Sequence, residues 1–392
     1  MKITSTLECR NREELFINIQ AIQAAGRLTP EARKALIAYG DGYSTCDLCL
    51  KPFRLDYIKT PPIAEFYCEL AKFVNMDVAK VVPGARRGFQ AVAHSLLREG
   101  DIVLVSSLAH YTLCVAVESA RAVWKEIPLN ENNTVTAAAT EEKIQQVKNE
   151  TGQLPKLVAV DHFDYQLGNE HEVSGIARVA HSYGIPFLYN GAYTVGVMPV
   201  DGKAIGADFL TGSGHKSMAS PAPTGVLATT EAFASYPFGT KDSEGDLTGR
   251  RFGIKEPHLL GCTVMGAPLI GMMASFPAVC ERVQHWGEEV QKSNYFVDQF
   301  LRIEGNAIDS EMPRKHTLTK VDTTLSFGRV AKKHKRRGYF LYDALQERGI
   351  AGPFPGATNA WKLNTYGLSW SQVEYVANAF LEIAVANGLA VK

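Results

Sequence analysis

The sequence has few features that would tie it to a membrane or to an oxidising compartment. No apolar run reaches the roughly 18 residues that a membrane-spanning helix needs, and the N-terminus lacks the basic-then-apolar pattern of a secretory signal. The seven cysteines are an odd number, which argues against a framework of disulfide bonds. We therefore expect a cytoplasmic protein with reduced thiols and without a membrane partner.

The sequence also lacks an excess of charge of either sign. Lys plus Arg and Asp plus Glu number 41 each, so any contact with nucleic acid must come from a local patch. The basic run 332–337, Lys-Lys-His-Lys-Arg-Arg, is the densest candidate. Such a run is often only solvated surface, and the alternative is a contact with RNA phosphates.

The length and the hydrophobic pattern predict an α/β protein of more than one domain. The 392 residues are too many for one small core. Short apolar runs alternate with helical spacing from residue 78 onward, which indicates a mostly parallel sheet covered by helices. The strands are expected at 78–82, 102–106, 122–128, 157–160, 187–190, 206–212 and 225–229. Ligands of such sheets bind beyond the carboxyl ends of the strands.

Three regions follow from this pattern. Residues 1–62 are expected to hold helices at 12–25 and 30–39 and then an irregular arm with a Cys-x-x-Cys pair. Residues 63–282 form the predicted large domain. Residues 283–392 begin with a long helix and continue as a smaller α+β domain.

The segment 213–216, Ser-Gly-His-Lys, carries the strongest chemical signal. It follows one apolar strand and precedes another, so Lys216 should lie on a loop between two buried strands. A lysine held there can form an imine with pyridoxal phosphate, while Ser213 and His215 offer hydrogen-bond donors to its phosphate. The alternative is a solvated surface lysine.

Other predicted turns supply groups that suit the same cofactor. Gly84-Ala85-Arg86-Arg87 opens a helix, whose first N–H groups can hold a phosphate. His110 and Tyr111 follow another strand, and the imidazole can lie over a pyridine ring, although plain packing is the alternative. The segment 161–166, Asp-His-Phe-Asp-Tyr-Gln, is polar enough to contact the cofactor, but the sequence does not single out one residue.

Three segments together resemble a known family. They are 161–168 (DHFDYQLG), 188–193 (LYNGAY) and 213–216 (SGHK), and their order and spacing resemble the large domain of the aspartate aminotransferase-like, fold type I pyridoxal phosphate enzymes, closest to the cysteine desulfurase branch. The resemblance implies that Lys216 is the Schiff-base lysine and that His110 stacks on the ring. It implies a phosphate site made by Ala85, Arg86, Ser213, Gly214 and His215. Asn190 would meet the pyridine nitrogen, where the family usually has an acid.

The cysteines and one late strand point to the substrate. Cys46 and Cys49 form the Cys-x-x-Cys pair, and Cys262 follows the predicted large domain. These thiols can store sulfur as a persulfide or hold an iron–sulfur cluster, and a structural role is the alternative. Lys362 stands where the superfamily usually has an arginine for a free α-carboxylate, which an esterified substrate would not need. The alternative is that Lys362 is an exposed strand residue and that the carboxylate is bound elsewhere.

The combination resembles the O-phosphoseryl-tRNA:cysteinyl-tRNA synthase family, which is archaeal. That resemblance implies a β-replacement in which phosphate leaves phosphoserine esterified to tRNA(Cys) and sulfur from a persulfide or sulfide donor takes its place. Arg86, Arg87, His110 and Tyr111 are candidates to bind the leaving phosphate, and Cys46, Cys49 or Cys262 would deliver sulfur. It implies a homodimer, and as partners the phosphoseryl-tRNA, a sulfur donor and the phosphoseryl-tRNA synthetase. The run 332–337 would then contact tRNA.

Two other functions remain open at this point. The first is a cysteine desulfurase or lyase that acts on a free amino acid. Such enzymes place a catalytic cysteine in the small domain, and here none follows Cys280. The second is an RNA-binding or iron–sulfur scaffold without activity, which requires that Lys216 carry no cofactor.

Overall fold

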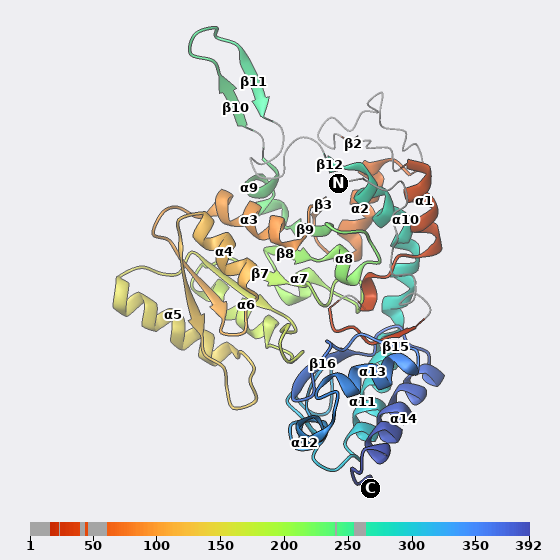
Figure 1. The fold of residues 1–392 in the computed structure, drawn as a ribbon. Coiled ribbons are helices and arrows are strands. Elements are labelled where there is room, and N and C mark those ends of the chain that lie inside the picture. Colours follow the sequence, from red (N-terminus) through yellow and green to blue (C-terminus); the bar gives the residue numbers. More distant parts are fainter. Residues whose placement is uncertain (1–15, 23, 40–43, 46–60, 240, 255–263) are drawn as a thin grey trace. The chain divides into compact units, whose positions relative to one another are not determined.

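The computed structural model describes residues 16–22, 24–39, 44–45, 61–239, 241–254 and 264–392 (Figure 1). The chain divides into two compact units. One is Ala25–Trp286, and the other is Gly287–Lys392 together with the N-terminal residues through Ala24.

The larger unit is built on a seven-stranded sheet with the order β3-β9-β8-β7-β6-β4-β5. Only β9 runs against its neighbours, and the other strands share one direction. The strands are β3 (Val78–Val82), β4 (Ile102–Ser106), β5 (Val123–Ile127), β6 (Leu157–Asp161), β7 (Phe187–Asn190), β8 (Phe209–Gly212) and β9 (Gly225–Thr229). This confirms the predicted mostly parallel α/β sheet.

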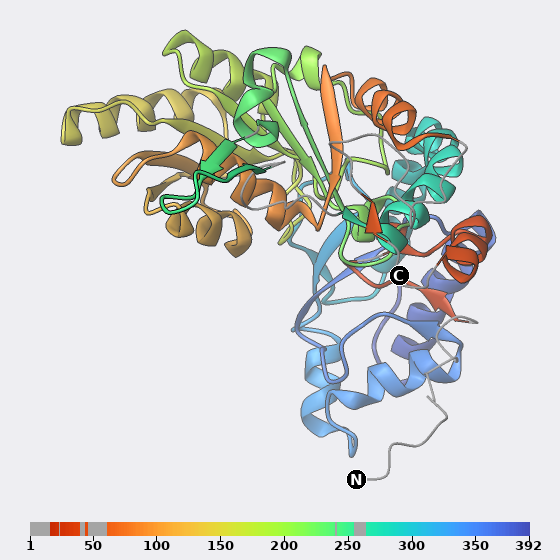
Figure 2. The ribbon, with the colours of Figure 1, turned by 90° about the horizontal axis from the view of Figure 1, so that it is seen from above.

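The inner strands form because they can be buried on both faces. In β4 and β6 every residue is buried, and their apolar side chains alternate between two hydrophobic cores. Helices α3 and α4 cover one face, whereas α2, α5, α6 and α10 contribute to the core on the other (Figure 2). Their bounds are α2 (Ile63–Phe73), α3 (Ala85–Leu96), α4 (Tyr111–Ser119), α5 (Ala137–Thr151), α6 (Val173–Ser182) and α10 (Gly266–Arg282).

Shorter elements complete the larger unit. Helix α1 packs along α10, and the hairpin of β10 and β11 extends away from the sheet (Figure 1). These elements and the remaining short ones are η2 (Ala24–Gly26), α1 (Pro30–Tyr39), β2 (Ser44–Thr45), α7 (Gly202–Ile205), α8 (Gly214–Ser217), η3 (Glu231–Phe233), α9 (Ser235–Phe238), β10 (Lys241–Glu244), β11 (Arg251–Ile254), β12 (Val264–Met265) and η4 (Val283–His285).

The smaller unit packs helices on a three-stranded antiparallel sheet of order β13-β14-β16. Its core is aromatic: Phe296, Phe300, Trp361 and Phe380 are buried and stack or meet edge to face. The elements are β1 (Ile17–Asn18), α11 (Trp286–Phe300), β13 (Ala307–Ile308), β14 (Leu318–Asp322), α12 (Phe327–Lys333), α13 (Tyr339–Glu347), β15 (Ile350–Ala351), β16 (Ala360–Asn364) and α14 (Trp370–Ala386). This agrees with the predicted α+β character.

The helix expected at 12–25 is wrong for the part of it that the structure describes. Residues 17 and 18 form β1, which pairs in parallel with β15, and residues 24–26 form a single 3-10 turn. Pairing with a distant strand satisfies the backbone N–H and C=O groups of this short segment, and that overrides its weak helical spacing. Among the described helices, none is both long enough and apolar enough to cross a membrane.

Candidate active site at the carboxyl edge of the sheet

Three neighbouring strands of the large sheet end in polar groups. Asp161 is the last residue of β6 and lies in register with Asn190, the last residue of β7. Asn190 is in turn in register with Thr211 of β8, which leads into the Ser213–Lys216 turn. Because these strands are parallel, their carboxyl ends meet at one edge of the sheet. The structure thus brings together residues that lie up to 55 positions apart in sequence.

Lys216 was predicted to lie in a loop. In the structure it lies in the one-turn helix α8. The turn forms because Ser217 and Met218 donate their backbone N–H groups to the carbonyls of Ser213 and Gly214. The Lys216 side chain is partly buried, and its Nζ lies 4.6 Å from the centroid of the Tyr193 ring. A lysine so placed is not a solvated surface residue.

Asp161 and Asn190 form a buried polar pair. Asn190 Nδ2 donates a hydrogen bond to Asp161 Oδ1, while Asn190 Oδ1 accepts one from the backbone N–H of Ala192 at 3.1 Å. The other carboxyl oxygen of Asp161, Oδ2, is buried and has no hydrogen-bond partner among the described residues. Burial raises the pKa of Asp161 to about 8; the charge of Asp164 adds to this rise, and Lys216 opposes it.

The predicted phosphate turn is built on two glycines. Gly84 has a φ of +89°, which a side chain would strain, and α3 begins at the next residue, Ala85. A Cβ on Gly225 would lie 2.6 Å from Ala85 N, so the backbone of β9 lies too close to this turn for any side chain at position 225. The free N–H groups of a helix start attract an anion.

His215 lies beside this turn. Its Cε1 is 3.8 Å from where a Cβ of Gly84 would be, and its Nδ1 is 2.9 Å from the carbonyl oxygen of Thr224. Burial lowers the pKa of His215, although the contact with Thr224 works in the opposite direction. The imidazole is therefore held neutral near the start of α3, and an arriving anion would favour its protonation.

His110 is fixed in place by the start of α4. Its ring nitrogen Nδ1 accepts from Thr112 N and lies 2.8 Å from Thr112 Oγ1. The ring packs against Tyr111 and Tyr165, at centroid distances of 4.5 and 4.8 Å. Tyr111 is well exposed, as is Arg86 in the first turn of α3.

The predicted residues are connected through two tyrosines that the sequence reasoning did not assign. Tyr165 touches His110, and the charges of Asp161 and Tyr165 act on Tyr193, which faces Lys216. Tyr193 comes three residues after Asn190 in the same turn, and this spacing is the feature of the sequence by which it could have been assigned to the site. Sequence alone did not distinguish Asp161 from its polar neighbours.

The cysteine predictions fall largely outside the structure. Cys46, Cys49 and Cys262 lie outside the described residues. Of the cysteines that are described, Cys68 is exposed, whereas Cys114 and Cys280 are partly buried. Burial raises the pKa of both of the latter thiols. No cluster of three or more metal-binding side chains occurs in the described part of the chain.

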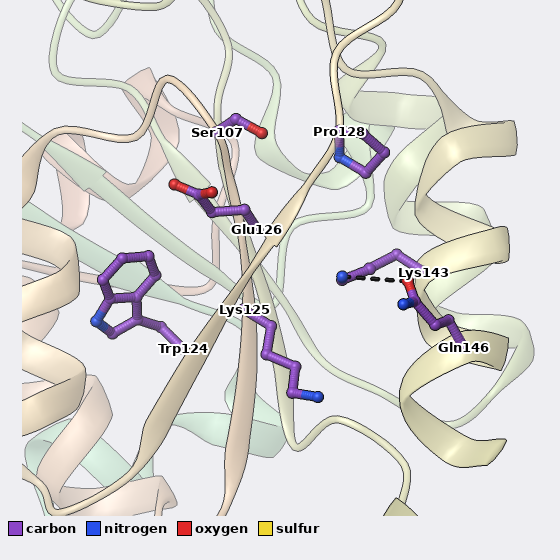
Figure 3. Close-up of a pocket in the computed structure, with 7 residues that line it drawn as sticks. All are labelled: Ser107, Trp124, Lys125, Glu126, Pro128, Lys143 and Gln146. Atoms are coloured by element: carbon purple, nitrogen blue, oxygen red, sulfur yellow. Dashed lines mark hydrogen bonds between the residues drawn. The ribbon is translucent and has the colours of Figure 1, made fainter. Parts of the chain in front are cut away.

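A separate hollow lies beside the edge strand β5 (Figure 3). Its lining comes from β5, the residue after β4 and helix α5, and includes none of the residues discussed above. Lys143 Nζ lies 3.2 Å from Gln146 Oε1 within it, and Lys125 forms an ion pair with Glu150. The lining residues are Ser107, Trp124, Lys125, Glu126, Pro128, Lys143 and Gln146.

Comparison with known proteins shows the family to which this chain belongs. The model of the class-V aminotransferases matches residues 64–321, so the chain belongs to that family, which implies a pyridoxal phosphate enzyme. The chain is 65% identical to an O-phospho-L-seryl-tRNA:Cys-tRNA synthase 1 of Methanococcoides burtonii, covering 98% of this chain and 84% of that protein. It is 58% identical to the synthase 1 of Methanoregula boonei over the whole of both chains. Within the class, it belongs to the O-phospho-L-seryl-tRNA:Cys-tRNA synthase family.

Solved structures lead to the same family. The crystal structure of a complex of SepCysS with the N-terminal domain of SepCysE matches with a TM-score of 0.86 and 42% identity, over 97% of both chains. A cysteine desulfurase from Thermococcus onnurineus matches with a TM-score of 0.70 over 97% of this chain and all of that one, but is only 18% identical, so it supports the fold alone. The predicted fold type and family are confirmed.

Proposed function

We propose that this protein converts O-phosphoseryl-tRNA(Cys) to cysteinyl-tRNA(Cys) by replacing the phosphate on Cβ with sulfur. The observation that carries the proposal is Lys216, held at the carboxyl edge of the sheet beside a buried acid and amide, in a chain 55% to 65% identical to synthases of that name. The reaction is a transfer that makes the aminoacyl-tRNA, not a hydrolysis.

The residues present fit pyridoxal phosphate. The site offers a partly buried lysine, a buried carboxyl oxygen that lacks a partner among the described residues, and a glycine turn at a helix start. Lys216 would hold the aldehyde end, and His110 would lie against the ring. Asn190 would face the nitrogen end, and the phosphate would be held by Ala85, Arg86, Ser213, Gly214 and His215. When bound, the cofactor withdraws electrons from Cα of the aminoacyl group.

The side chains of this site would handle protons and phosphate. The amine of Lys216 would remove the proton from Cα, and the neutral ring of Tyr193 would stabilise the ammonium that forms. Phosphate leaves Cβ with growing negative charge, which cationic or O–H donors stabilise. The candidates for stabilising the leaving phosphate are Arg86, His110 and Tyr111. Arg86 and Tyr111 are exposed, so an entering substrate can reach them.

Sulfur would come from Cys46, Cys49 or Cys262. The terminal sulfur of a cysteine persulfide would bond to Cβ, and a second thiolate would then attack the inner sulfur, leaving a disulfide and the cysteinyl product. Burial keeps Cys114 and Cys280 protonated, which makes them poor nucleophiles. An iron–sulfur cluster on the same three cysteines is the other use of this set.

The basic segment 332–337 would bind tRNA phosphates. Lys332, Lys333 and Lys335 are exposed at the end of α12 and in the turn that follows. Arg336 forms an ion pair with Asp343 and lies over the exposed ring of Tyr339, at 5.9 Å from the centroid. Cations beside an exposed aromatic ring suit a nucleic acid, because phosphate charge and base stacking are then both met. We propose that the protein acts as a cytoplasmic homodimer, and that a sulfur donor and the phosphoseryl-tRNA synthetase are further partners.

One assay separates this function from its nearest rival. Purified protein is given sulfide and either phosphoseryl-tRNA(Cys) or free phosphoserine, and phosphate release and cysteine formation are followed. We expect turnover of the tRNA ester at least about 100-fold above that of free phosphoserine, since binding of the tRNA positions the reacting group. Equal turnover of both, or release of sulfur from free cysteine, would favour the desulfurase or lyase function.

A further inference from the structure

The site has a buried acid, Asp161, on the strand next to the one that ends in Asn190. Asn190 ends β7, at the position where the family usually has an acid, and Asp161 ends the neighbouring strand β6 in register with it. Asp161 is only 5% exposed and Asn190 only 3%. The two side chains meet through the hydrogen bond from Asn190 Nδ2 to Asp161 Oδ1.

The amide of Asn190 is already engaged at both ends. Its Nδ2 donates to Asp161, and its Oδ1 accepts from Ala192 N at 3.1 Å. Asp161, by contrast, leaves Oδ2 buried without a hydrogen-bond partner among the described residues. An unsatisfied buried carboxyl oxygen is costly, and a ligand that brings a hydrogen-bonding nitrogen would remove that cost.

We propose that Asp161 binds the pyridine nitrogen of the cofactor and holds it protonated, and that Asn190 is a positioning residue that fixes the carboxylate. The inference rests on the proposed use of pyridoxal phosphate. An amide can only hydrogen-bond to this nitrogen, whereas a carboxylate forms an ion pair with the protonated ring and keeps the cofactor a strong electron sink.

The charges around Asp161 support the transfer of a proton from its carboxyl group to the pyridine nitrogen. Lys216 and Asp164 act on Asp161 with opposite sign, and Asp161 in turn acts on Tyr193 and Cys114. Burial raises the pKa of Asp161 to about 8, so without the cofactor the carboxyl is neutral at pH 7. A neutral pyridine nitrogen that enters would take the proton from Oδ2, which leaves a carboxylate and a pyridinium ion side by side.

The first test compares two cofactors on the unaltered protein. The cofactor-free protein is titrated with pyridoxal phosphate and with its 1-deaza analogue, in which a C–H replaces the ring nitrogen. We expect the analogue to bind about 10- to 100-fold more weakly, because it cannot accept the proton of Asp161. Equal affinity would overturn the inference but leave the proposed function intact, whereas no binding of pyridoxal phosphate at all would defeat both.

The second test uses variants and a spectroscopic readout. The pyridine nitrogen of bound cofactor is labelled with ¹⁵N, and its chemical shift reports whether it is protonated. Asp161→Asn keeps the shape of the side chain and should lose the signal of the protonated nitrogen. Asn190→Ala should retain that signal, and its affinity for the cofactor should fall less than that of Asp161→Asn. A protonated signal in Asp161→Asn would overturn the assignment. Circular dichroism of each variant checks that it is folded.

Discussion

The ammonium nitrogen of Lys216 lies 4.6 Å from the centroid of the Tyr193 ring. Tyr193 belongs to the turn after β7, and Lys216 to the helix after β8. Burial, followed by the charge of Asp161, raises the pKa of Tyr193, so its phenol stays neutral and the face of the ring attracts a cation. This contact places the lysine where the strand ends converge.

Replacing this lysine should remove the cofactor but not the fold. Lys216→Ala is expected to be colourless after reconstitution, since no amine remains to hold pyridoxal phosphate covalently. Its melting temperature without cofactor should stay within a few degrees of the parent. Absorption spectra and cofactor content check this. Lys156→Ala, at an exposed lysine of the same unit, should stay coloured, and a coloured Lys216→Ala would contradict the site.

The close contact between Gly225 and the predicted phosphate turn at Gly84 and Ala85 leaves no room for one added methyl group. Gly225→Ala would put Cβ 2.6 Å from both Ala85 N and Gly84 C, so the turn or β9 must shift. We expect a loss of about 1–3 kcal/mol in the free energy of unfolding and cofactor binding weaker by about tenfold or more. Urea denaturation and cofactor titration measure the two effects. Gly287→Ala, in α11 with nothing within 4 Å of the new Cβ, should have neither effect.

A buried histidine should make the protein sensitive to acid. His171 Nδ1 accepts from Val135 N at 3.1 Å, and burial, helped by His162, lowers the pKa of His171 to about 4. Below its unfolded pKa of about 6.5 the unfolded chain takes up a proton that the folded chain does not, so this part of the stability is lost as pH falls from about 6.5 to 4.

The size of this effect is at most about 3 kcal/mol. His171→Asn removes the titration while keeping an acceptor near Nδ1. The variant should therefore be less stable at pH 7 but decline less between pH 6.5 and 4.5 when unfolding is followed by urea at each pH. His285→Asn, at an exposed histidine, serves as the control. Parallel curves for His171→Asn and the parent would contradict the prediction.

The basic segment should contribute to tRNA affinity through charge. The triple variant Lys332→Glu, Lys333→Glu and Lys335→Glu removes three exposed cations of that segment. If each lysine contacts a phosphate, the plot of the logarithm of the association constant for tRNA against the logarithm of the salt concentration should become less steep, by about three in slope. Filter binding of tRNA at several salt concentrations measures it.

The control for this variant has the same change in net charge elsewhere. Lys34→Glu, Lys148→Glu and Lys156→Glu alter three exposed lysines of the larger unit. Equal losses of affinity in both triple variants would mean that net charge matters and that the segment does not. If affinity for tRNA is unaltered and binding of a partner protein is lost instead, the segment is a protein interface.

The sulfur step should be separable from the loss of phosphate. Serine at Cys46, Cys49 or Cys262 should abolish cysteine formation from a persulfide donor while phosphate release from phosphoseryl-tRNA continues. Cys114→Ser and Cys280→Ser should preserve both steps, because burial keeps those thiols protonated. Phosphate and cysteine are measured in the same reaction. If all three variants still make cysteine, these thiols are not the carriers.

Local sequence was enough to find the strands and to place Lys216 between two of them. Strands such as β4 and β6 are unbroken apolar runs because both of their faces are buried, and a run of that kind can be read without any partner. Lys216 stands among small residues between two such runs, so its position also follows from neighbouring residues. The helix expected at 12–25 failed because β1 depends on β15, more than 300 residues away.

The sequence by itself determined the class of chemistry: a lysine, a glycine turn and polar strand ends, in the order that a pyridoxal phosphate enzyme has them. Only the tertiary structure decided which polar group faces which. The register of β6 against β7 brings Asp161 to Asn190, and burial leaves one carboxyl oxygen without a partner among the described residues. The physical reason is that hydrogen bonding and desolvation depend on the atoms around a group in space, and those atoms come from strands that the chain connects only through long helices.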